Sequence, residues 1–321
     1  MRGKGVIDPN NRPGGPNLVL TAKNANKVQF FDARTLTKTG EIDMPASTHE
    51  LVLSPDGTKV YGSIYGGGRF GETKNPDRRI AIIDLASKTL ERTIDVGASL
   101  APHGITLCGT TIWATGELGN LLFAIDPDTD RVKRVELDGS PHWLAFSQTA
   151  RKLFASFKTD QFVAVVDADR LMPVDKITIP GRAEGLAISP EGTALYVCAH
   201  ERNELHMFDT QNHALRRSHI IDGAPGKNQL KRVRVSPDGK YVVVSQNFDD
   251  HCAIFEAESL KQIASFKTKQ SPMGFGFAAD GKHAFLCCHG DATVLEFELE
   301  SGRITREFGT DKGCEFIICY Q

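Results

Sequence analysis

Short apolar segments alternate along the chain with polar turns that contain glycine. Such segments flank the turn Ser54-Pro55-Asp56-Gly57, and the same arrangement recurs at Ser189-Pro190-Glu191-Gly192, at Ser236-Pro237-Asp238-Gly239 and, degraded, at Ala278-Ala279-Asp280-Gly281. Proline fixes φ at the start of a tight turn, and glycine readily adopts the positive φ that such a turn requires. The pattern therefore predicts a series of β-hairpins.

A second apolar run in each repeat ends in an acidic residue. The seven copies end at Asp32, Asp84, Asp126, Asp167, Asp209, Glu256 and Glu298. Because Asp accepts hydrogen bonds from the backbone that follows it, we interpret these acids as turn-forming residues. Taken together, the two patterns place the first strands of the repeats near residues 49, 103, 142, 184, 231, 273 and 314, with spacings of 39 to 54 residues. Repeats of this length are typical of four-stranded propeller blades, so the sequence predicts an all-β, seven-bladed β-propeller of antiparallel blades.

The two ends of the chain complement each other. Residues 17–45 contain three predicted strands without a preceding first strand, and residues 314–321 form a first strand without followers. An open ring would expose two sheet edges, so we predict that both ends share one blade. We assign residues 1–321 to a single propeller domain, with residues 1–16 as an N-terminal extension.

The repeats resemble the YVTN-type (YncE-like) β-propeller family over nearly the whole chain. The segments that carry the resemblance are SPDGTKVYGS, SPEGTALYVCAHERNELHMFD and SPDGKYVVVSQNFDDHCAIFE. The architecture is also similar to the lactonase family, to the heavy subunits of amine dehydrogenases and to the propeller of nitrous-oxide reductase, in which histidines around the axis hold copper. The resemblance implies a propeller fold but specifies no activity, because one fold hosts many functions.

Composition narrows the classes of partner. The net charge is −2, and Lys and Arg are spread along the chain rather than gathered in the basic stripe that nucleic acid requires. No apolar run is long enough for a membrane helix or a signal peptide, and the seven cysteines lack metal-finger spacing. We therefore expect no nucleic-acid or membrane partner and a cytoplasmic protein with reduced cysteines, unless an export signal has been removed.

Aligning the repeats predicts two rings of side chains at one mouth of the central channel. The inner ring, at the start of the first strands, comprises His49, His103, His142, Glu184, Lys231, Met273 and Cys314. The outer ring, at the end of the second strands, comprises Lys23, Tyr65, Glu117, Lys158, His200, Asn247 and His289. Five of the ten histidines fall on these positions, which makes the mouth the candidate functional site.

Three imidazoles with a carboxylate, a thiolate or water form a common ligand set for zinc, copper or iron. We therefore predict a divalent transition metal bound by His49, His103 and His142, with Cys314 as a flanking ligand. An alternative reading is that these histidines are mouth residues, each hydrogen-bonded to a backbone carbonyl.

A metal-free catalytic site is a further alternative. In that case His103 or His142 acts as a general base, and Lys231 is an electrostatic clamp for a carboxylate. The candidate catalytic residues are Glu117, Glu184, His200 and Lys231. The candidate substrate contacts are Tyr65, Arg69, Lys158, Asn247 and His289.

Residues 66–71 match the spacing of a dinucleotide-binding glycine motif, but no helix follows them to hold a phosphate. We predict instead that residues 66–78 form a long loop beside the channel mouth. The sequence thus favours an enzyme or a metal-dependent ligand-binding protein that acts on a small polar or anionic molecule, with lactone hydrolysis or isomerase or lyase chemistry as the leading reactions. The alternatives are a non-catalytic scaffold for a protein or peptide partner and a subunit of a redox complex.

Overall fold

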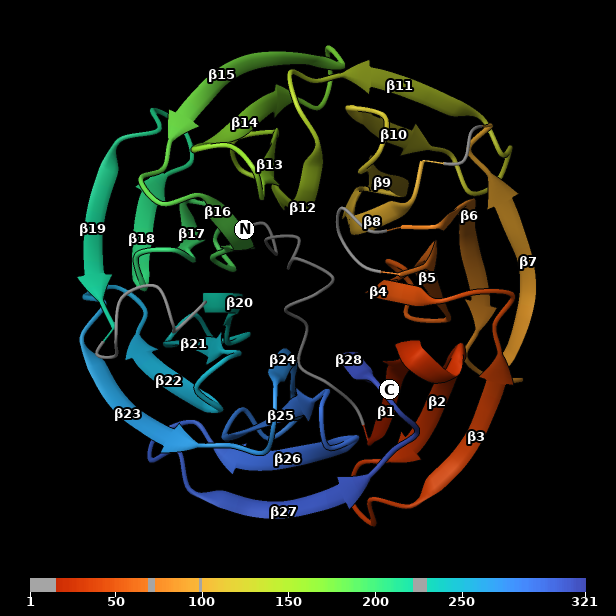
Figure 1. Cartoon of the computed structure of the whole chain (residues 1–321), viewed down its shortest axis with the longest axis vertical. Helices are drawn as coiled ribbons and strands as arrows, with labels where there is room; N and C mark the ends of the chain where they lie inside the picture. The colour runs from red at the N-terminus through yellow and green to blue at the C-terminus, as the bar shows by residue number, and fades with distance from the viewer. Residues whose placement is uncertain (1–15, 69–72, 98–99, 222–229) are drawn as a thin grey trace, which may run out of the picture.

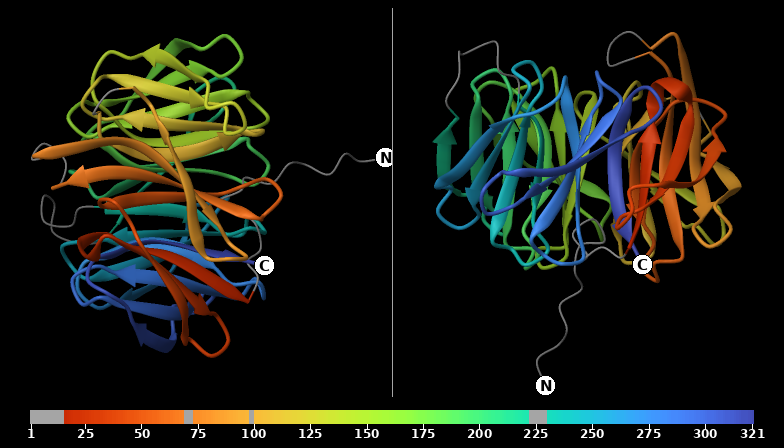
Figure 2. Two further views of the ribbon diagram at one scale, coloured as in Figure 1. Left: turned by 90° about the vertical axis from the view of Figure 1, so that its right-hand side faces the viewer. Right: turned by 90° about the horizontal axis from the view of Figure 1, so that it is seen from below.

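The computed structural model describes residues 16–68, 73–97, 100–221 and 230–321. Within these ranges seven sheets of four antiparallel strands are arranged in a ring around one axis (Figure 1). Seen from the side, the ring is a disc whose strands run from one face to the other (Figure 2). The predicted seven-bladed, all-β fold is confirmed.

The blades are numbered here in chain order, each from its innermost strand outward. Blade 1 contains β4 (Thr48–Leu53), β5 (Lys59–Gly67), β6 (Asn75–Asp84) and β7 (Thr89–Asp95). Blade 2 contains β8 (Pro102–Cys108), β9 (Thr111–Gly116), β10 (Leu121–Ile125) and β11 (Val132–Glu136). Blade 3 contains β12 (Pro141–Ser147), β13 (Lys152–Phe157), β14 (Phe162–Asp167) and β15 (Met172–Thr178). Blade 4 contains β16 (Ala183–Ile188), β17 (Ala194–Ala199), β18 (Glu204–Asp209) and β19 (Leu215–Ile220).

The remaining three blades complete the ring. Blade 5 contains β20 (Leu230–Val235), β21 (Tyr241–Gln246), β22 (His251–Glu256) and β23 (Gln262–Lys267). Blade 6 contains β24 (Pro272–Phe277), β25 (His283–Cys288), β26 (Thr293–Glu298) and β27 (Ile304–Gly309). Blade 7 contains β28 (Cys314–Tyr320), β1 (Asn17–Ala22), β2 (Lys27–Asp32) and β3 (Lys38–Asp43), with the short 3-10 turn η2 (Lys23–Ala25) after β1. The chain has no helix, among the residues described, that is long and apolar enough to cross a membrane.

Blade 7 is built from both ends of the chain, as predicted. Its innermost strand is β28, which pairs antiparallel with β1 in the register Leu20↔Ile317. All seven residues of β28 are buried. The pairing gives β1 a partner on its inner edge and leaves no gap in the ring, which removes the exposed edges that an open propeller would have.

The repeated turns form as their sequences predict. In the first of them Gly57 has a φ of 77°, and its N–H donates to the carbonyl of Ser54 over 3.0 Å. The Ser54 hydroxyl donates to Asp56 over 2.6 Å and accepts from the N–H of Lys59 over 2.9 Å. These local bonds fix the hairpin between β4 and β5, and so they set which residues of β4 lie at the opposite face of the disc.

The acids that end the third strands bind the turns that follow them. For example, the Asp32 carboxylate accepts from the N–H groups of Arg34 and Thr35, both over 2.8 Å. Asp209 accepts from the N–H groups of Gln211 and Asn212 in the same way. Their recurrence therefore has a structural cause, as we predicted.

A break in the strand register turns the start of each innermost strand toward the axis. In blade 1, Thr48 pairs with Ile64 and Leu51 pairs with Gly62, so two residues of β4 oppose Ser63 alone. Irregularities occur at the corresponding point of the other six innermost strands. Such bulges bend a strand and redirect its side chains, often beside functional sites.

Hydroxyl groups on the second strands hold these bulges and link neighbouring blades. The Ser63 hydroxyl accepts from the N–H of Glu50 over 3.2 Å and donates to the carbonyl of His103 in blade 2 over 2.6 Å. Thr115 bridges Gly104 and the carbonyl of His142 likewise, over 2.8 and 3.1 Å. The hydroxyls satisfy backbone groups that the bulge leaves unpaired, so they fix the backbone of the ring histidines.

The predicted loop at residues 66–78 is only partly a loop. Strand β5 continues to Gly67 and β6 begins at Asn75, with Gly66 paired to Pro76, so the two strands extend as a hairpin that projects from one face of the disc (Figure 2). The prediction was wrong for these residues because strand pairing continues past the buried part of the blade. Residues 69–72, which include Arg69, lie outside the described residues.

Candidate functional site

Six of the seven predicted inner-ring residues occupy equivalent places around the axis. They are the second residues of their strands, namely His49, His103, His142, Glu184, Lys231 and Met273. The three histidines are only 3% exposed, and Glu184 is equally well buried. The repeat alignment therefore located a cluster of polar side chains that the ring takes out of water.

The seventh inner position belongs to Glu315, and the assignment of Cys314 was wrong by one residue. The Cys314 thiol lies 3.3 Å from the carbonyl of Cys288 and 3.4 Å from that of Thr293, so it packs against blade 6. The Glu315 carboxylate contacts Lys23 at 3.3 Å and His49 at 4.0 Å. Neighbouring residues on a strand point to opposite faces, so an alignment that is wrong by one residue assigns to the channel a side chain that packs against the next blade.

The outer ring lies against the inner ring. Glu117 contacts His142 at 2.9 Å, Lys158 contacts Glu184 at 3.7 Å, and each pair joins one blade to the next. Asn247 donates to the sulfur of Met273 over 3.2 Å. His289 lies 3.8 Å from Glu315. The structure thus brings the two predicted rings together in one site.

Aromatic stacking orders the three ring histidines. The rings of His103 and His142 stack with centroids 4.0 Å apart, and His49 meets His103 edge-on at 4.8 Å. Tyr65 stacks on His49 at 4.3 Å and donates its hydroxyl to Glu117 over 2.6 Å. Thr73 in turn donates to the Tyr65 hydroxyl over 2.7 Å. His103 therefore lies between the other two histidines, and the described part of the β5–β6 hairpin borders the site.

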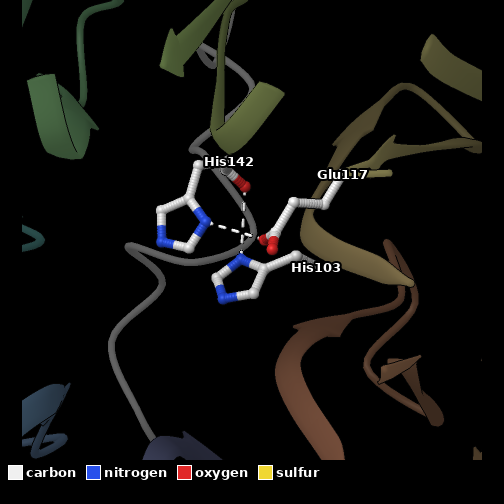
Figure 3. A group of neighbouring side chains, drawn as sticks. All are labelled: His103, Glu117 and His142. Carbon is white, nitrogen blue, oxygen red and sulfur yellow. Dashed lines mark hydrogen bonds and ion pairs between the residues drawn. The ribbon is translucent and has the colours of Figure 1, made fainter. Parts of the chain in front are cut away.

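Among the described residues, His103, Glu117 and His142 form a group of potential metal ligands (Figure 3). One ligand atom from each of the three lies within 4.8 Å of the others, and all three residues are buried. His142 presents Nδ1 to Glu117 at 2.9 Å and Nε2 to Glu184 at 3.5 Å. The Nδ1 atom of His103 lies 3.2 Å from the carbonyl oxygen of His142.

Burial keeps two of the histidines neutral. It lowers the pKa of His49 well below the usual value, and the charges of Lys23 and Arg232 lower it further. Burial lowers the pKa of His103 in the same way, with added effects from His142 and His49. Neither ring nitrogen of His49 has a hydrogen-bond partner among the described residues. A neutral imidazole is the form that binds a metal, and an unpartnered buried one is costly unless a ligand completes it.

The acids of the site are held in different states. Burial alone would raise the pKa of Glu184, but Lys231, His142 and Lys158 outweigh it and hold that pKa well below its usual value. Burial likewise opposes ionisation of Glu315, yet Lys23 and Arg232 lower its pKa to about 2. Burial raises the pKa of Glu50 to about 8 in spite of Arg232. Near neutral pH, Glu184 and Glu315 are therefore ionised, whereas Glu50 holds a proton.

Sequence reasoning missed a second polar layer one residue further along the inner strands. Arg232 donates to Glu50 over 2.8 Å and to Glu315 over 3.1 Å, and its guanidinium lies 3.9 Å from the centre of the Trp143 ring. The signal was present in the sequence, because charged residues interrupt otherwise apolar strands directly after the ring positions. Simple alternation predicts that the residue after each ring position points away from the axis. The bulges instead place two successive residues near the axis, so the alternation rule did not reveal this second layer.

Comparison with known proteins agrees with this architecture. Residues 185–313 match the family described as "Lactonase, 7-bladed beta-propeller". The resemblance to lactonase-like seven-bladed propellers is confirmed. The matched residues include His200 and Lys231 but none of the three ring histidines. The match therefore supports the fold and says nothing of the histidine cluster.

Two further proteins are similar to the chain. "Antigen Lp49" of Leptospira interrogans serogroup Icterohaemorrhagiae serovar copenhageni (strain Fiocruz L1-130) is 20% identical over 277 residues, which is 79% of this chain and 58% of the antigen. The chain thus spans little more than half of that relative's length. The solved structure of Kuenenia stuttgartiensis hydrazine synthase superposes with a TM-score of 0.76 at 17% identity, covering 93% of this chain and 98% of that chain. At this identity the likeness shows the fold alone.

Proposed function

We propose that the channel mouth is a metal-dependent site for a small polar molecule, with His103, His142 and Glu117 as the metal ligands. The observation that carries the proposal is the convergence of these three buried donors within 4.8 Å. Two imidazoles and a carboxylate form a ligand set typical of zinc, iron and copper in proteins, and three protein ligands leave room for a substrate or water.

The surroundings of His142 support this assignment. With Nδ1 directed at the ligand group, Nε2 remains to donate to Glu184, which lies 3.5 Å away and stays ionised. A carboxylate on the remote nitrogen of a ligating histidine fixes its tautomer and makes it a better donor, and loss of such a partner commonly weakens metal binding 10- to 100-fold. Glu117 is oriented in turn by the hydroxyl of Tyr65.

A divalent transition metal would supply Lewis acidity to a carbonyl oxygen or to a water molecule. The chain's own residues would do the rest. Tyr65 and Trp143 contact the ring histidines and keep water from two sides of the cluster. His49 adds a third neutral imidazole beside His103. This arrangement favours hydrolysis, isomerisation or elimination on a small molecule, with lactone hydrolysis as the first reaction to assay.

The metal content of the purified protein tests the proposal. We expect about one zinc, iron or copper ion per chain by elemental analysis, and the His103→Ala variant should lose most of it while it keeps the β-sheet circular dichroism signal. The matched control is His283→Ala, because His283 lies beside the Asp280 turn, outside the cluster. Glu184→Gln should retain the metal with about 10- to 100-fold weaker affinity.

A defined result would overturn the proposal. Wild-type protein that carries no metal, and whose melting temperature does not rise with zinc, copper or iron, would exclude a metal site. Stoichiometric metal that persists equally in His103→Ala, His142→Ala and Glu117→Gln would place the ion elsewhere in the chain.

A further inference from the structure

The carboxylate of Glu315 is the centre of a second group of polar side chains at the mouth. The ammonium of Lys23 lies 3.3 Å from its Oε2, and Nδ1 of His289 lies 3.8 Å from the same oxygen. The guanidinium of Arg232 donates to Oε1 over 3.1 Å, and Nδ1 of His49 lies 4.0 Å from that atom. These side chains come from blades 1, 5, 6 and 7, so closure of the ring assembles the group.

The hydrogen-bonding capacity of this carboxylate is only partly used. A carboxylate offers about four acceptor sites, two on each oxygen. Arg232 takes one site on Oε1, whereas Oε2 pairs electrostatically with Lys23 and accepts no hydrogen bond from a described residue. Lys23 and Arg232 lower the pKa of Glu315 to about 2, so the group is ionised near neutral pH. Each oxygen can therefore accept a further hydrogen bond.

The two imidazoles beside these oxygens lack partners as well. Neither ring nitrogen of His49 has a hydrogen-bond partner among the described residues, and Nδ1 of His289 has none either. The amide of Asn24 lies 3.3 Å from Nε2 of His289. With Nε2 accepting from that amide, the ring proton of a neutral His289 is on Nδ1, the nitrogen nearer Glu315. Buried polar atoms without partners are rare in folded proteins and call for a ligand.

The backbone holds the outer members of the group in place. Lys23 and Asn24 belong to η2, and the N–H of Lys23 donates to the carbonyl of Gly313 over 2.9 Å. The N–H of His289 donates to the carbonyl of Ser271, also over 2.9 Å. The side chain of His289 is 23% exposed and that of Glu315 is 4% exposed, so a ligand would reach the carboxylate from the side of His289.

The separations within the group fit a bridging oxygen. At 3.8 and 4.0 Å the two imidazole nitrogens are too far from Glu315 for direct hydrogen bonds. One oxygen at the usual distance of about 2.8 Å can reach both members of such a pair. A hydroxyl suits this place, because it accepts from an imidazole N–H and donates to a carboxylate. The charges of Lys23 and Arg232 disfavour a metal ion here, and Glu315 itself disfavours an anion.

We propose that Glu315, His49 and His289 bind a vicinal diol of a small molecule. Each hydroxyl donates to one oxygen of Glu315 and accepts a hydrogen bond from one imidazole. The two oxygens of a carboxylate are spaced much like the hydroxyls of a vicinal diol, so one acid can hold both. Hydrogen bonds to an ionised acceptor are about twice as strong as those between neutral groups. Lys23 and Arg232 keep the carboxylate ionised and in place.

The position of the diol site extends the substrate class, and this part alone rests on the proposed metal site. His49 meets His103, one of the proposed metal ligands, edge-on with ring centroids 4.8 Å apart. One imidazole therefore separates the diol site from the metal ligands. The substrate is accordingly a short molecule that carries two adjacent hydroxyls near the group that would meet the metal.

Diol binding is measured in chelator-treated, metal-free protein, so that its result does not depend on the metal. Protein labelled with ¹⁵N in its histidine rings is titrated with meso-erythritol and followed by NMR. The signals of His49 and His289 should shift and saturate at millimolar concentration. The matched control ligand is 1,4-butanediol, which has the same four-carbon chain without adjacent hydroxyls and should bind at least about ten-fold more weakly.

Two variants assign the binding to these residues. Glu315→Gln should weaken erythritol binding about ten-fold or more, because it removes the ionised acceptor. His289→Ala should weaken it about three- to ten-fold, because it removes one neutral donor. His289 is partly exposed, so this variant keeps the proposal testable if Glu315→Gln unfolds the protein. His283→Ala, beside the Asp280 turn, is the control and should bind as the wild type does.

Several results would overturn the diol site. They are the absence of a saturable shift with erythritol, an equal response to 1,4-butanediol, and unchanged affinity in both Glu315→Gln and His289→Ala. The metal site fails separately. Diol binding by a protein that never takes up metal would support the diol site and refute the metal site, whereas metal uptake without diol binding would do the reverse.

Discussion

The buried arginine under the histidine cluster offers the sharpest test of how the channel is stabilised. Replacing Arg232 by Met keeps an unbranched, largely apolar side chain but removes the hydrogen bond to Glu50 at 2.8 Å and the ion pair with Glu315 at 3.1 Å. The stacking of the guanidinium on Trp143 at 3.9 Å is lost as well. Both acids and the arginine are less than 5% exposed, so water cannot replace the missing charge.

The size of the effect follows from this burial. Breaking a buried ion pair by removing one partner costs about 3–5 kcal/mol, because the other charge remains buried. Glu315 keeps Lys23 as a partner, and Glu50 is already protonated near neutral pH, so we expect a value in this range rather than above it. At about 2.1 cal/mol/K of unfolding entropy per residue, a chain of 321 residues should melt about 4–8 °C lower.

Chemical denaturation at pH 7 with circular dichroism measures the loss, with Arg234→Met as the control. Arg234 lies two residues along the same strand and stacks on Phe316 at 4.8 Å, so its replacement removes a guanidinium from the same strand but leaves the contacts of Arg232 with Glu50 and Glu315 in place. The double variant Arg232→Met/Glu315→Gln should lose at least about 1 kcal/mol less than the sum of the single losses, because the two residues are coupled. A loss below about 1 kcal/mol for Arg232→Met, or additive single losses, would refute the reasoning.

Two further predictions concern pH and ring closure. The pKa of Glu50 is raised to about 8, so the folded state binds its proton more tightly than the unfolded state, and Glu50 makes wild-type stability fall as pH rises from about 4.5 to about 8. Glu50→Gln should remove this decline. The pKa of Glu315 is lowered to about 2, so its ionised form stabilises the wild type, and this contribution is lost only as pH falls below about 4.5; Glu315→Gln should lack the contribution at neutral pH. Parallel pH profiles in urea titrations would contradict both. Deleting residues 314–321 should leave the protein insoluble or sharply destabilised, because β1 loses its inner partner, and a truncated protein that melts at the wild-type temperature would contradict the closure.

The repeat pattern by itself determined the fold and most of the site. The turn at Ser54 and its three copies fix the ends of four innermost strands, and counting back from them gives the residue that faces the axis. This worked for the strands of His49, Glu184, Lys231 and Met273, because the same hairpin sets the same register each time, and the alignment of the repeats extended it to His103 and His142. The chemistry of the mouth was thus visible as an excess of histidines at one repeat position.

The last strand lacks this reference, and there the sequence was insufficient. No hairpin turn follows β28, so nothing in the sequence shows whether Cys314 or Glu315 faces the channel. Only the pairing of β28 with β1, at the other end of the chain, decides this register. The register in turn determines whether a thiol or a carboxylate faces the channel. A register that depends on a distant segment cannot be read from local pattern.

Tertiary structure also decided which polar residues act together. The network of Arg232 with Glu50 and Glu315 joins blades 5, 1 and 7, and the pairing of Glu117 with His142 joins blades 2 and 3. Bulges held by the hydroxyls of Ser63 and its counterparts bring two successive residues of a strand to the axis, against the simple alternation of strand side chains. The sequence determined the ring because hairpins are local, whereas the site depends on closure of the ring, which brings side chains from separate blades within reach of one another.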